Sequence, residues 1–165
     1  MLIMGLGAQL VGWPDSLCAQ LEERGFFLVR SDNRDIGLST HLDWLSVPNV
    51  LAVAVGRRRP AYTLDDLAKD TAGLIEALSL GPVHLVGASM GSFIAQLVAI
   101  RRPEIVRNLT LMMTSSGHRW IGRPTVAVMS ATLRRKPRSS GLIVDRSLPY
   151  AASAWRGGQP ALGVV

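Results

Sequence analysis

Residues 81–101 have the sequence GPVHLVGASMGSFIAQLVAIR, and the fold that we predict starts from this stretch. The apolar residues 83–86 predict a buried strand, residues 87–91 form a G-x-S-x-G motif, and an apolar helix follows at once. This order is typical of a nucleophile elbow, in which the central serine occupies a tight, strained turn. We expect Gly87 and Gly91 to be needed because a Cβ at either position would collide with a neighbouring strand or helix. Ser89 is therefore the candidate nucleophile.

A bare G-x-S-x-G motif also arises by chance, especially in a chain with 16 glycines. The strand before the motif and the helix after it favour an elbow over coincidence. Ser89 would then lie at the carboxyl end of a strand and beside a helix N-terminus, whose free N–H groups favour negative charge. Acyl transfer needs this geometry, because negative charge develops in its transition state.

Short strands and helices alternate on both sides of the elbow. The predicted strands are residues 2–6, 26–29, 83–86 and 109–113. The predicted helices begin near Pro14, after the N-cap Thr63, and directly after the elbow, and they end at Gly25, Gly81 and Pro103. This alternation predicts an α/β fold with a mostly parallel sheet of about four strands and helices on both faces.

Composition and charge divide the chain in two. The apolar content of 48% suffices for a sizeable core, and no run reaches the roughly 18 apolar residues of a membrane span. Residues 1–7 are predicted to be a core strand rather than a signal peptide, and the single Cys18 excludes an internal disulfide, so we expect a cytoplasmic protein. The net charge is −1 over residues 1–118 and +7 over residues 119–165.

The basic C-terminal part has a weaker pattern than the rest. Residues 124–133 are compatible with one helix, residues 134–141 form a charged breaker, and residues 147–165, with Gly157-Gly158 and Pro160, show no sustained period. Residues 50–55, farther upstream, are apolar and compatible with a short helix or a strand. We therefore predict a core over residues 1–117 and an irregular, poorly ordered tail over residues 118–165.

Five segments in order carry a family resemblance. They are LIMGLG (2–7), GWP (12–14), DNRDIGLS (32–39), YTLDDLA (62–68) and VGASMG (86–91). With these segments the chain resembles the α/β-hydrolase superfamily, and more narrowly its esterase and lipase branch of aclacinomycin methylesterase-type and mycobacterial lipase-like proteins. The resemblance covers roughly residues 1–117. It implies a partial α/β-hydrolase fold, because the family's opening strands and its last strands have no counterpart; we expect a truncated member whose tail is a cap remnant or a shifted reading frame.

The resemblance also assigns roles to residues. It implies that Ser89 is the nucleophile and that the backbone N–H groups of Met90 and Leu6 form the oxyanion hole. Gly5 and Gly7, on either side of Leu6, would line the substrate site, and the turn at residues 32–39 would buttress the nearby loops. The expected substrate is a small-molecule or lipid-like carboxylic ester, with no cofactor.

The acid and base of a catalytic triad are not evident. In this fold the acid and then the histidine follow the serine along the chain, but Glu104 directly follows the elbow helix and Asp145 comes after His118. We expect His118 and His41 to be surface residues and His84 to be a core residue of its strand. No cluster with metal-ligand spacing and no phosphate-binding glycine motif is present, so we predict no metal and no nucleotide.

Three functions therefore compete. The leading one is a serine carboxylic-ester hydrolase, and the second is a non-catalytic remnant that acts as an interaction protein. The third, nucleic-acid binding through the basic tail, is the weakest because the tail has little aromatic interleaving and no recognisable reader motif. The strand at residues 109–113 would lack its neighbour, and an open apolar edge predicts self-association.

Overall fold

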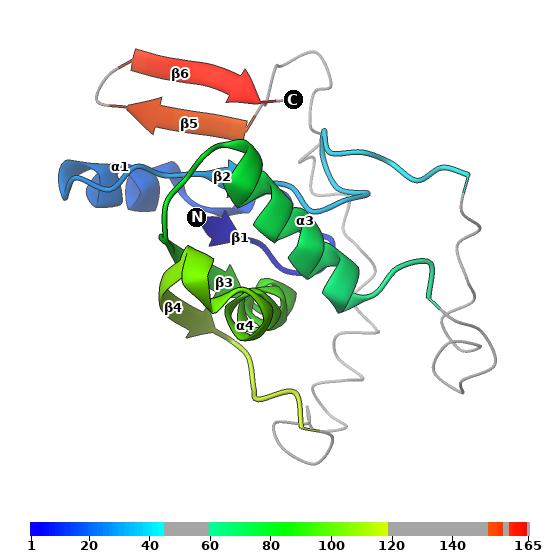
Figure 1. Cartoon of the computed structure of the whole chain (residues 1–165). Helices are drawn as coiled ribbons and strands as arrows, with labels where there is room; N and C mark the ends of the chain where they lie inside the picture. The colour runs from blue at the N-terminus through cyan, green and yellow to red at the C-terminus, as the bar shows by residue number, and fades with distance from the viewer. Residues whose placement is uncertain (45–59, 119–151, 157–158, 165) are drawn as a thin grey trace, which may run out of the picture.

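The computed structural model describes residues 1–44, 60–118, 152–156 and 159–164 (Figure 1). Its centre is a four-stranded sheet in the order β2-β1-β3-β4. The strands are β1 (Leu2–Ile3), β2 (Arg30–Ser31), β3 (Val83–Ala88) and β4 (Val106–Met112). All three neighbouring pairs are parallel, which confirms the predicted α/β architecture. The elements expected at residues 50–55 and 124–133 lie outside the described residues.

Three helices lie between the strands within the described ranges. They are α1 (Asp15–Glu23), α3 (Leu64–Ala77) and α4 (Met90–Arg101), with short 3₁₀ turns at η1 (Leu10–Gly12) and η2 (Pro103–Ile105). Thr63 caps α3 as predicted, because its hydroxyl accepts the N–H of Asp66 while the Asp66 side chain accepts the N–H of Thr63. Gly25, at φ +85°, follows the end of α1, where a left-handed residue is common.

The two faces of the sheet have separate apolar clusters. Successive side chains of a strand point to opposite faces, so Ile3 and Leu85 pack with α3 and α4, whereas Leu2 and Val86 pack with Trp13 and with Cys18 of α1. Figure 1 shows α3 and α4 lying next to each other beside the sheet. Helices therefore cover both faces, as predicted, and the larger cluster lies under α3 and α4.

Two strands differ from their predicted positions. β1 is shorter than residues 2–6, and β2 lies just after the apolar run at residues 26–29. Leu28 and Val29 are buried, but Phe26 and Phe27 are 43% and 42% exposed. Because β1 pairs only through Leu2 and Ile3, the ladder is confined to the residues opposite them, Arg30 and Ser31. Hydrophobicity alone therefore placed this strand a few residues too early.

Two further strands lie near the C-terminus, where the sequence shows no sustained period. β5 (Ala152–Arg156) and β6 (Gln159–Val164) pair in antiparallel fashion. Arg156 pairs with Gln159, so only a Gly-Gly dipeptide separates the strands in sequence. A Gly-Gly pair between two short segments is a typical sequence signal of a two-residue hairpin loop. The sequence-based interpretation of these glycines as breakers does not predict this hairpin.

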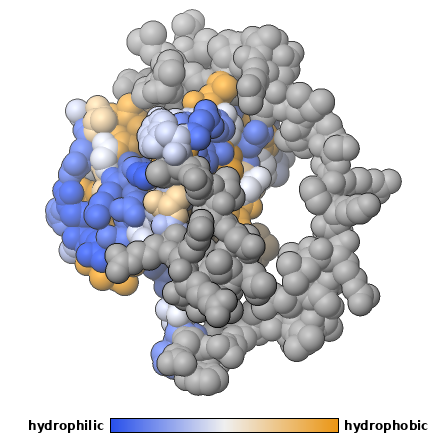
Figure 2. Space-filling model, turned by 90° about the vertical axis from the view of Figure 1, so that its right-hand side faces the viewer, coloured by the Kyte–Doolittle hydropathy of each residue, from blue (hydrophilic) through white to orange (hydrophobic). Residues whose placement is uncertain are grey.

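Among the described strands, β4 has a neighbour on one side only. β4 is the last strand in the order of the sheet. Residues 107–111 of this strand are all exposed, although Leu109 and Leu111 are apolar. Hydrophobic residues also reach the surface at several separate places among hydrophilic ones on the face shown in Figure 2. Within the described residues, no helix has the length and apolar character needed to cross a membrane.

Candidate functional site

Ser89 occupies the sharp turn between β3 and α4. Its backbone angles, φ 52° and ψ −116°, lie in a region that residues with a Cβ rarely adopt, which is the strain expected of an elbow. The Ser89 N–H donates to the carbonyl of Met112 on β4 at 2.9 Å, which fixes the turn to the sheet. The residue is exposed, and among the described residues its hydroxyl makes no hydrogen bond. A solvent-facing hydroxyl is thus available at the end of β3.

The two glycines of the motif are required by close backbone approaches. A Cβ on Gly87 would lie 2.6 Å from the carbonyl carbon of Gly91 and from the Cα of Ser92. A Cβ on Gly91 would lie 2.7 Å from the carbonyl oxygen of Met4 and would also collide with the Ile3 carbonyl. Real Cβ atoms essentially never come this close, so the strand, the helix and β1 meet only because these positions lack side chains. The collision predicted from the sequence is confirmed.

Ser92 stabilises the turn at Ser89 through buried hydrogen bonds, and this residue was not identified from the sequence. Its side chain is fully buried, and its hydroxyl donates to the Gly87 carbonyl at 2.6 Å. The same hydroxyl accepts the N–H of Met112 at 3.2 Å, and it also lies 3.0 Å from the Met112 carbonyl. It thereby connects β3, α4 and β4 next to Ser89. The one available signal was a serine at the third helical position, on the side that faces the sheet.

The loop after β1 lies against Ser89. A Cβ on Gly5 would be 3.2 Å from the Cβ of Ser89, so the Gly5 backbone and Ser89 are direct neighbours. Gly7, at φ +67°, and the bond from the Ala8 N–H to the Gly5 carbonyl at 3.2 Å form the turn that contains Leu6. The Leu6 side chain is 82% exposed, and its amide has no acceptor among the described residues. Ser89 therefore faces the loop at residues 5–7.

The second predicted donor, the amide of Met90, is the first N–H of α4. The first N–H groups of a helix have no partner inside the helix, so this amide points out of the N-terminus beside Ser89. The α4 N-terminus also carries partial positive charge. The arrangement brings Met90, Gly5 and the turn around Leu6 next to Ser89, and the family resemblance had assigned these residues to one site.

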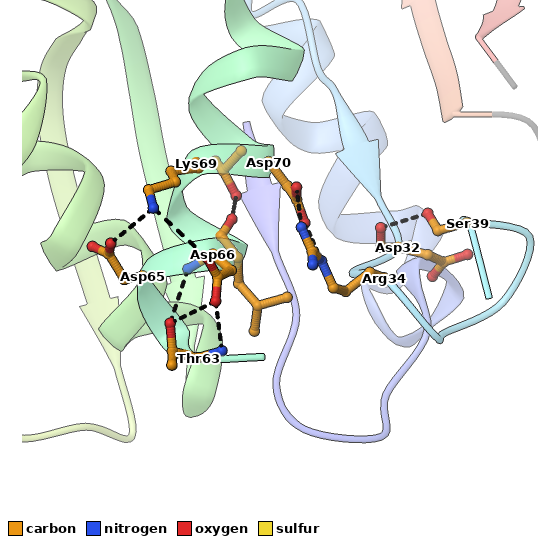
Figure 3. Close-up of polar contacts among 10 residues, drawn as sticks. Asp32, Arg34, Ser39, Thr63, Asp65, Asp66, Lys69 and Asp70 are labelled. Atoms are coloured by element: carbon orange, nitrogen blue, oxygen red, sulfur yellow. Dashed lines mark hydrogen bonds and ion pairs between the residues drawn. The ribbon is translucent and has the colours of Figure 1, made fainter. Parts of the chain in front are cut away.

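The turn after β2 holds the loop next to Ser89. The Asp32 carboxylate accepts the N–H of Leu10 at 2.6 Å, and the Asn33 side-chain amide donates to the Met4 carbonyl at 3.1 Å. Burial raises the pKa of Asp32, and the N–H groups of Leu10 and Leu38 oppose this shift. The Ser39 hydroxyl donates to the Asp32 carbonyl at 2.7 Å (Figure 3). The turn thus contacts the loop at both of its ends.

The same turn is anchored to α3 by a separate set of contacts. Arg34 reaches Asp70 through two hydrogen bonds of 2.6 Å (Figure 3). Its guanidinium also lies 5.3 Å from the centre of the Tyr62 ring. The hydrogen bond to Asp70 raises the pKa of Arg34 above its ordinary value. Arg34 thus points away from Asp32 and Asn33, so the contacts of the turn divide between α3 and the loop.

No described histidine or carboxylate hydrogen-bonds to Ser89. His41 contacts the Gly37 carbonyl at 3.0 Å, and His84 contacts Asn108 at 3.1 Å and the edge of the Phe26 ring. His118 is exposed and follows β4. Glu104 is on the surface and pairs with Arg102, and Asp145 lies outside the described residues. Among the described residues, Ser89 therefore has no acid or base as a hydrogen-bond partner.

The described residues offer no metal site, and their groove lies away from Ser89. No group of three or more His, Cys, Asp or Glu side chains among them could hold a metal ion. A groove of about 550 Å³ lies at the opposite end of the sheet, where Phe26, Phe27, Pro82 and His84 line it together with the beginnings of β1 and β3. Neither Ser89 nor the loop at residues 5–7 lines this groove.

Comparisons with known proteins show which family has this fold and this sequence pattern. Residues 1–138 match the family described as alpha/beta hydrolase fold, so the match continues beyond residue 117. The chain is 31% identical over 144 residues to the rhodomycin D methylesterases DauP of Streptomyces sp. (strain C5) and DnrP of Streptomyces peucetius. It is also 36% identical over 86 residues, 52% of the chain, to 30% of a poly(3-hydroxyalkanoate) depolymerase of Ectopseudomonas oleovorans.

The lengths of these relatives differ from that of the chain. The two methylesterase alignments include 87% of the chain but only 43% of each methylesterase. The chain therefore spans less than half the length of the curated relatives that it matches.

Proposed function

The chain belongs to the alpha/beta hydrolase fold family, and we propose that it is a serine carboxylic-ester hydrolase with Ser89 as its nucleophile. The observation that carries this proposal is the exposed, strained Ser89 at the end of β3, next to Gly5 and to the N-terminus of α4. Relatives named as methylesterases support the same chemistry.

In the proposed reaction, Ser89 Oγ attacks the ester carbonyl carbon and a general base takes the hydroxyl proton. The carbonyl oxygen becomes negatively charged, and the amides of Met90 and Leu6 donate hydrogen bonds to it. The alcohol leaves with a proton and an acyl-serine remains, which water then hydrolyses to the free acid and Ser89. No described histidine or carboxylate hydrogen-bonds to Ser89, so we propose that the base and the residue that orients it lie outside the described residues.

The substrate class follows from the relatives and from the exposure of the serine. Two relatives are named for a methyl ester, so we propose an ester with a small alcohol group as the first substrate to test. Gly5 and Gly7 would line the acyl side of the site, where glycine leaves room for a substrate close to the backbone. Because no part of this mechanism draws on a cofactor, none is proposed.

Hydrolysis of p-nitrophenyl acetate and of methyl esters by the purified chain tests the proposal. We expect Ser89→Ala to abolish turnover while the thermal midpoint changes little, because the side chain is exposed. Ser79→Ala is the matched control, since Ser79 is also an exposed serine with positive φ (51°) but follows α3. Equal turnover by Ser89→Ala and the parent chain would refute the proposal.

A non-catalytic interaction protein is the second candidate. It is favoured by the absence of a histidine or carboxylate partner for Ser89 among the described residues. A folded chain that hydrolyses none of these esters and does not react with a fluorophosphonate would support it.

We also propose a partner, namely a second copy of the chain. In the part of the chain that the structure describes, β4 is bonded to a neighbouring strand on one side only, and an open edge strand presents unpaired N–H and C=O groups. Two copies of β4 can pair in antiparallel fashion around Leu109, which puts Asn108 opposite Thr110 of the second copy. In that register the two Arg107 residues are four positions apart, about 14 Å, so their repulsion is screened in physiological salt.

A further inference from the structure

The loop between β1 and η1 is attached to the rest of the chain at two points, and one dipeptide supplies both attachments. Asp32 binds the N–H of Leu10 at 2.6 Å, at the far end of the loop. Asn33 binds the carbonyl of Met4 at 3.1 Å, at the near end. Between these points lies the turn that contains Leu6, whose amide has no acceptor among the described residues.

The near attachment also touches the elbow. The Met4 carbonyl oxygen lies where a Cβ on Gly91 would come within 2.7 Å, so this peptide unit lies between the Asn33 amide and the backbone of α4. The next residue, Gly5, contacts Ser89. A hydrogen bond from Asn33 therefore sets the orientation of a peptide unit that is packed directly against the nucleophile turn.

The far attachment restrains the other end of the loop. Leu10 is 3% exposed, so its side chain anchors the loop in the core while the Asp32 carboxylate holds its N–H. Asp32 is in turn fixed by Ser39, whose hydroxyl donates to the Asp32 carbonyl at 2.7 Å (Figure 3). A Cβ on Gly37 would lie 2.6 Å from the Asp32 carboxyl carbon, so the turn closes tightly around this side chain.

From these contacts we propose that Asp32 and Asn33 are positioning residues, which hold the loop at residues 4–10 so that the Leu6 amide is directed at the oxyanion formed above Ser89. The inference rests on the proposed ester hydrolysis. A donor that is already oriented before the reaction stabilises the developing charge without reorganisation, and loss of one such donor costs on the order of 10²–10³ in kcat. Loosening the loop keeps the donor but spreads its position, so we expect a smaller loss.

The test compares Asn33 with its neighbour Arg34. Asn33→Ala and the equally sized Asn33→Asp both remove the donor to Met4, whereas Arg34→Gln breaks the pair with Asp70 and leaves the loop contacts intact. We expect both Asn33 variants to lower kcat for an ester by about tenfold with KM nearly unchanged, because the oxyanion contact exists only in the transition state. Arg34→Gln should lower the thermal midpoint and leave kcat unchanged.

Amide hydrogen exchange of residues 5–9 provides a readout that does not need activity. We expect faster exchange of these amides in both Asn33 variants than in the parent chain and in Arg34→Gln. Unchanged exchange in this loop, or an equal loss of kcat in Arg34→Gln, would overturn the inference. If the parent chain has no activity, the proposed function fails, and the exchange rates alone then decide whether Asn33 holds the loop.

Discussion

At the residue scale, Ser89 and the glycines around it explain one another. Ser89 can adopt φ 52° because Gly87 and Gly91 let β3, α4 and β1 approach without side chains between them. Ser92 then ties the three elements together through its buried hydroxyl. The strain at position 89 is therefore held by contacts on both sides of it, as is expected where strain is part of a site.

Gly91→Ala tests this explanation directly. The added Cβ would meet the Met4 carbonyl oxygen and the Ile3 backbone, neither of which can rotate away, so we expect a loss of unfolding free energy of at least about 1–3 kcal/mol. Gly73→Ala on α3 is the matched control. A Cβ there meets nothing within 4 Å, and alanine is the better helix former by up to about 1 kcal/mol, so this variant should be more stable. Urea unfolding measures both values; a Gly91→Ala chain as stable as the parent would show that the elbow is not this tight.

At the element scale, α3 shows how local sequence sets a boundary. Thr63 and Asp66 cap the N-terminus reciprocally, and Asp65 forms an ion pair with Lys69 (Figure 3). Asp65 also forms an ion pair with Arg101 of α4. The hydrogen bonds from Thr63 hold the pKa of Asp66 below its ordinary value of 3.8. These contacts place α3 beside α4, and Arg34 connects α3 to the turn that holds the loop at the site.

The Asp66 carboxylate predicts an acid dependence of stability. Because its folded-state pKa lies below that of the unfolded chain, folding favours the ionised form. This stabilisation is complete above the unfolded value of 3.8 and is lost as the pH falls through the lower folded value. We expect the unfolding midpoint in urea to decline less steeply below about pH 4 in Asp66→Asn than in the parent chain. Glu23→Gln on α1 is the control, and identical pH profiles for Asp66→Asn and the parent chain would contradict the capping role.

At the scale of the whole molecule, the sheet is covered unevenly. α3 and α4 cover one face, whereas α1 covers the other face only in part and leaves the groove lined by Phe26 and Phe27. β4 ends the sheet with a row of exposed residues. Among the described residues, this groove and the edge of β4 are therefore incompletely covered, and an edge strand can pair with a second copy of itself.

The open edge of β4 predicts that two copies of the chain associate, and a charged side chain introduced on this edge should prevent the association. In the proposed antiparallel pair, Leu109 faces its own copy, so Leu109→Lys places two like charges opposite each other. Leu109 is already 37% exposed, which lets the lysine reach solvent without disrupting the core. Ile100→Lys, at a 75% exposed position of α4, adds the same charge away from the edge. Light scattering after size exclusion should show a concentration-dependent dimer in the parent chain and in Ile100→Lys only; a monomer at all concentrations would contradict the pairing.

Much of this architecture is predictable because it depends on local signals. The motif around Ser89, the cap at Thr63 and the stop at Pro103 each act within a few residues, and the structure places them as expected. The position of β2 was not predictable, because a two-residue ladder depends on which part of the chain lies opposite Leu2 and Ile3.

The family resemblance implied that the turn at residues 32–39 supports the nearby loops, but the individual hydrogen bonds that support the candidate site were not predictable. Ser92 and Asn33 are single polar residues, and their partners Met112 and Met4 are 20 and 29 positions away in the chain. Backbone carbonyls serve as these partners, and a carbonyl group carries no sequence signal. Ser89 was identified from its motif, whereas Met90, Leu6, Gly5 and Gly7 were added by the family resemblance, and the roles of all five stay predictions.

The most direct measurement of the central claim is the identification of the residue that a fluorophosphonate modifies. The intact chain is incubated with the probe and digested, and mass spectrometry locates the adduct. We expect a single phosphonylated peptide that carries the adduct on Ser89, and no adduct in Ser89→Ala. Folded protein that remains unmodified, or that is modified equally after Ser89→Ala, would contradict the assignment of Ser89 as the nucleophile.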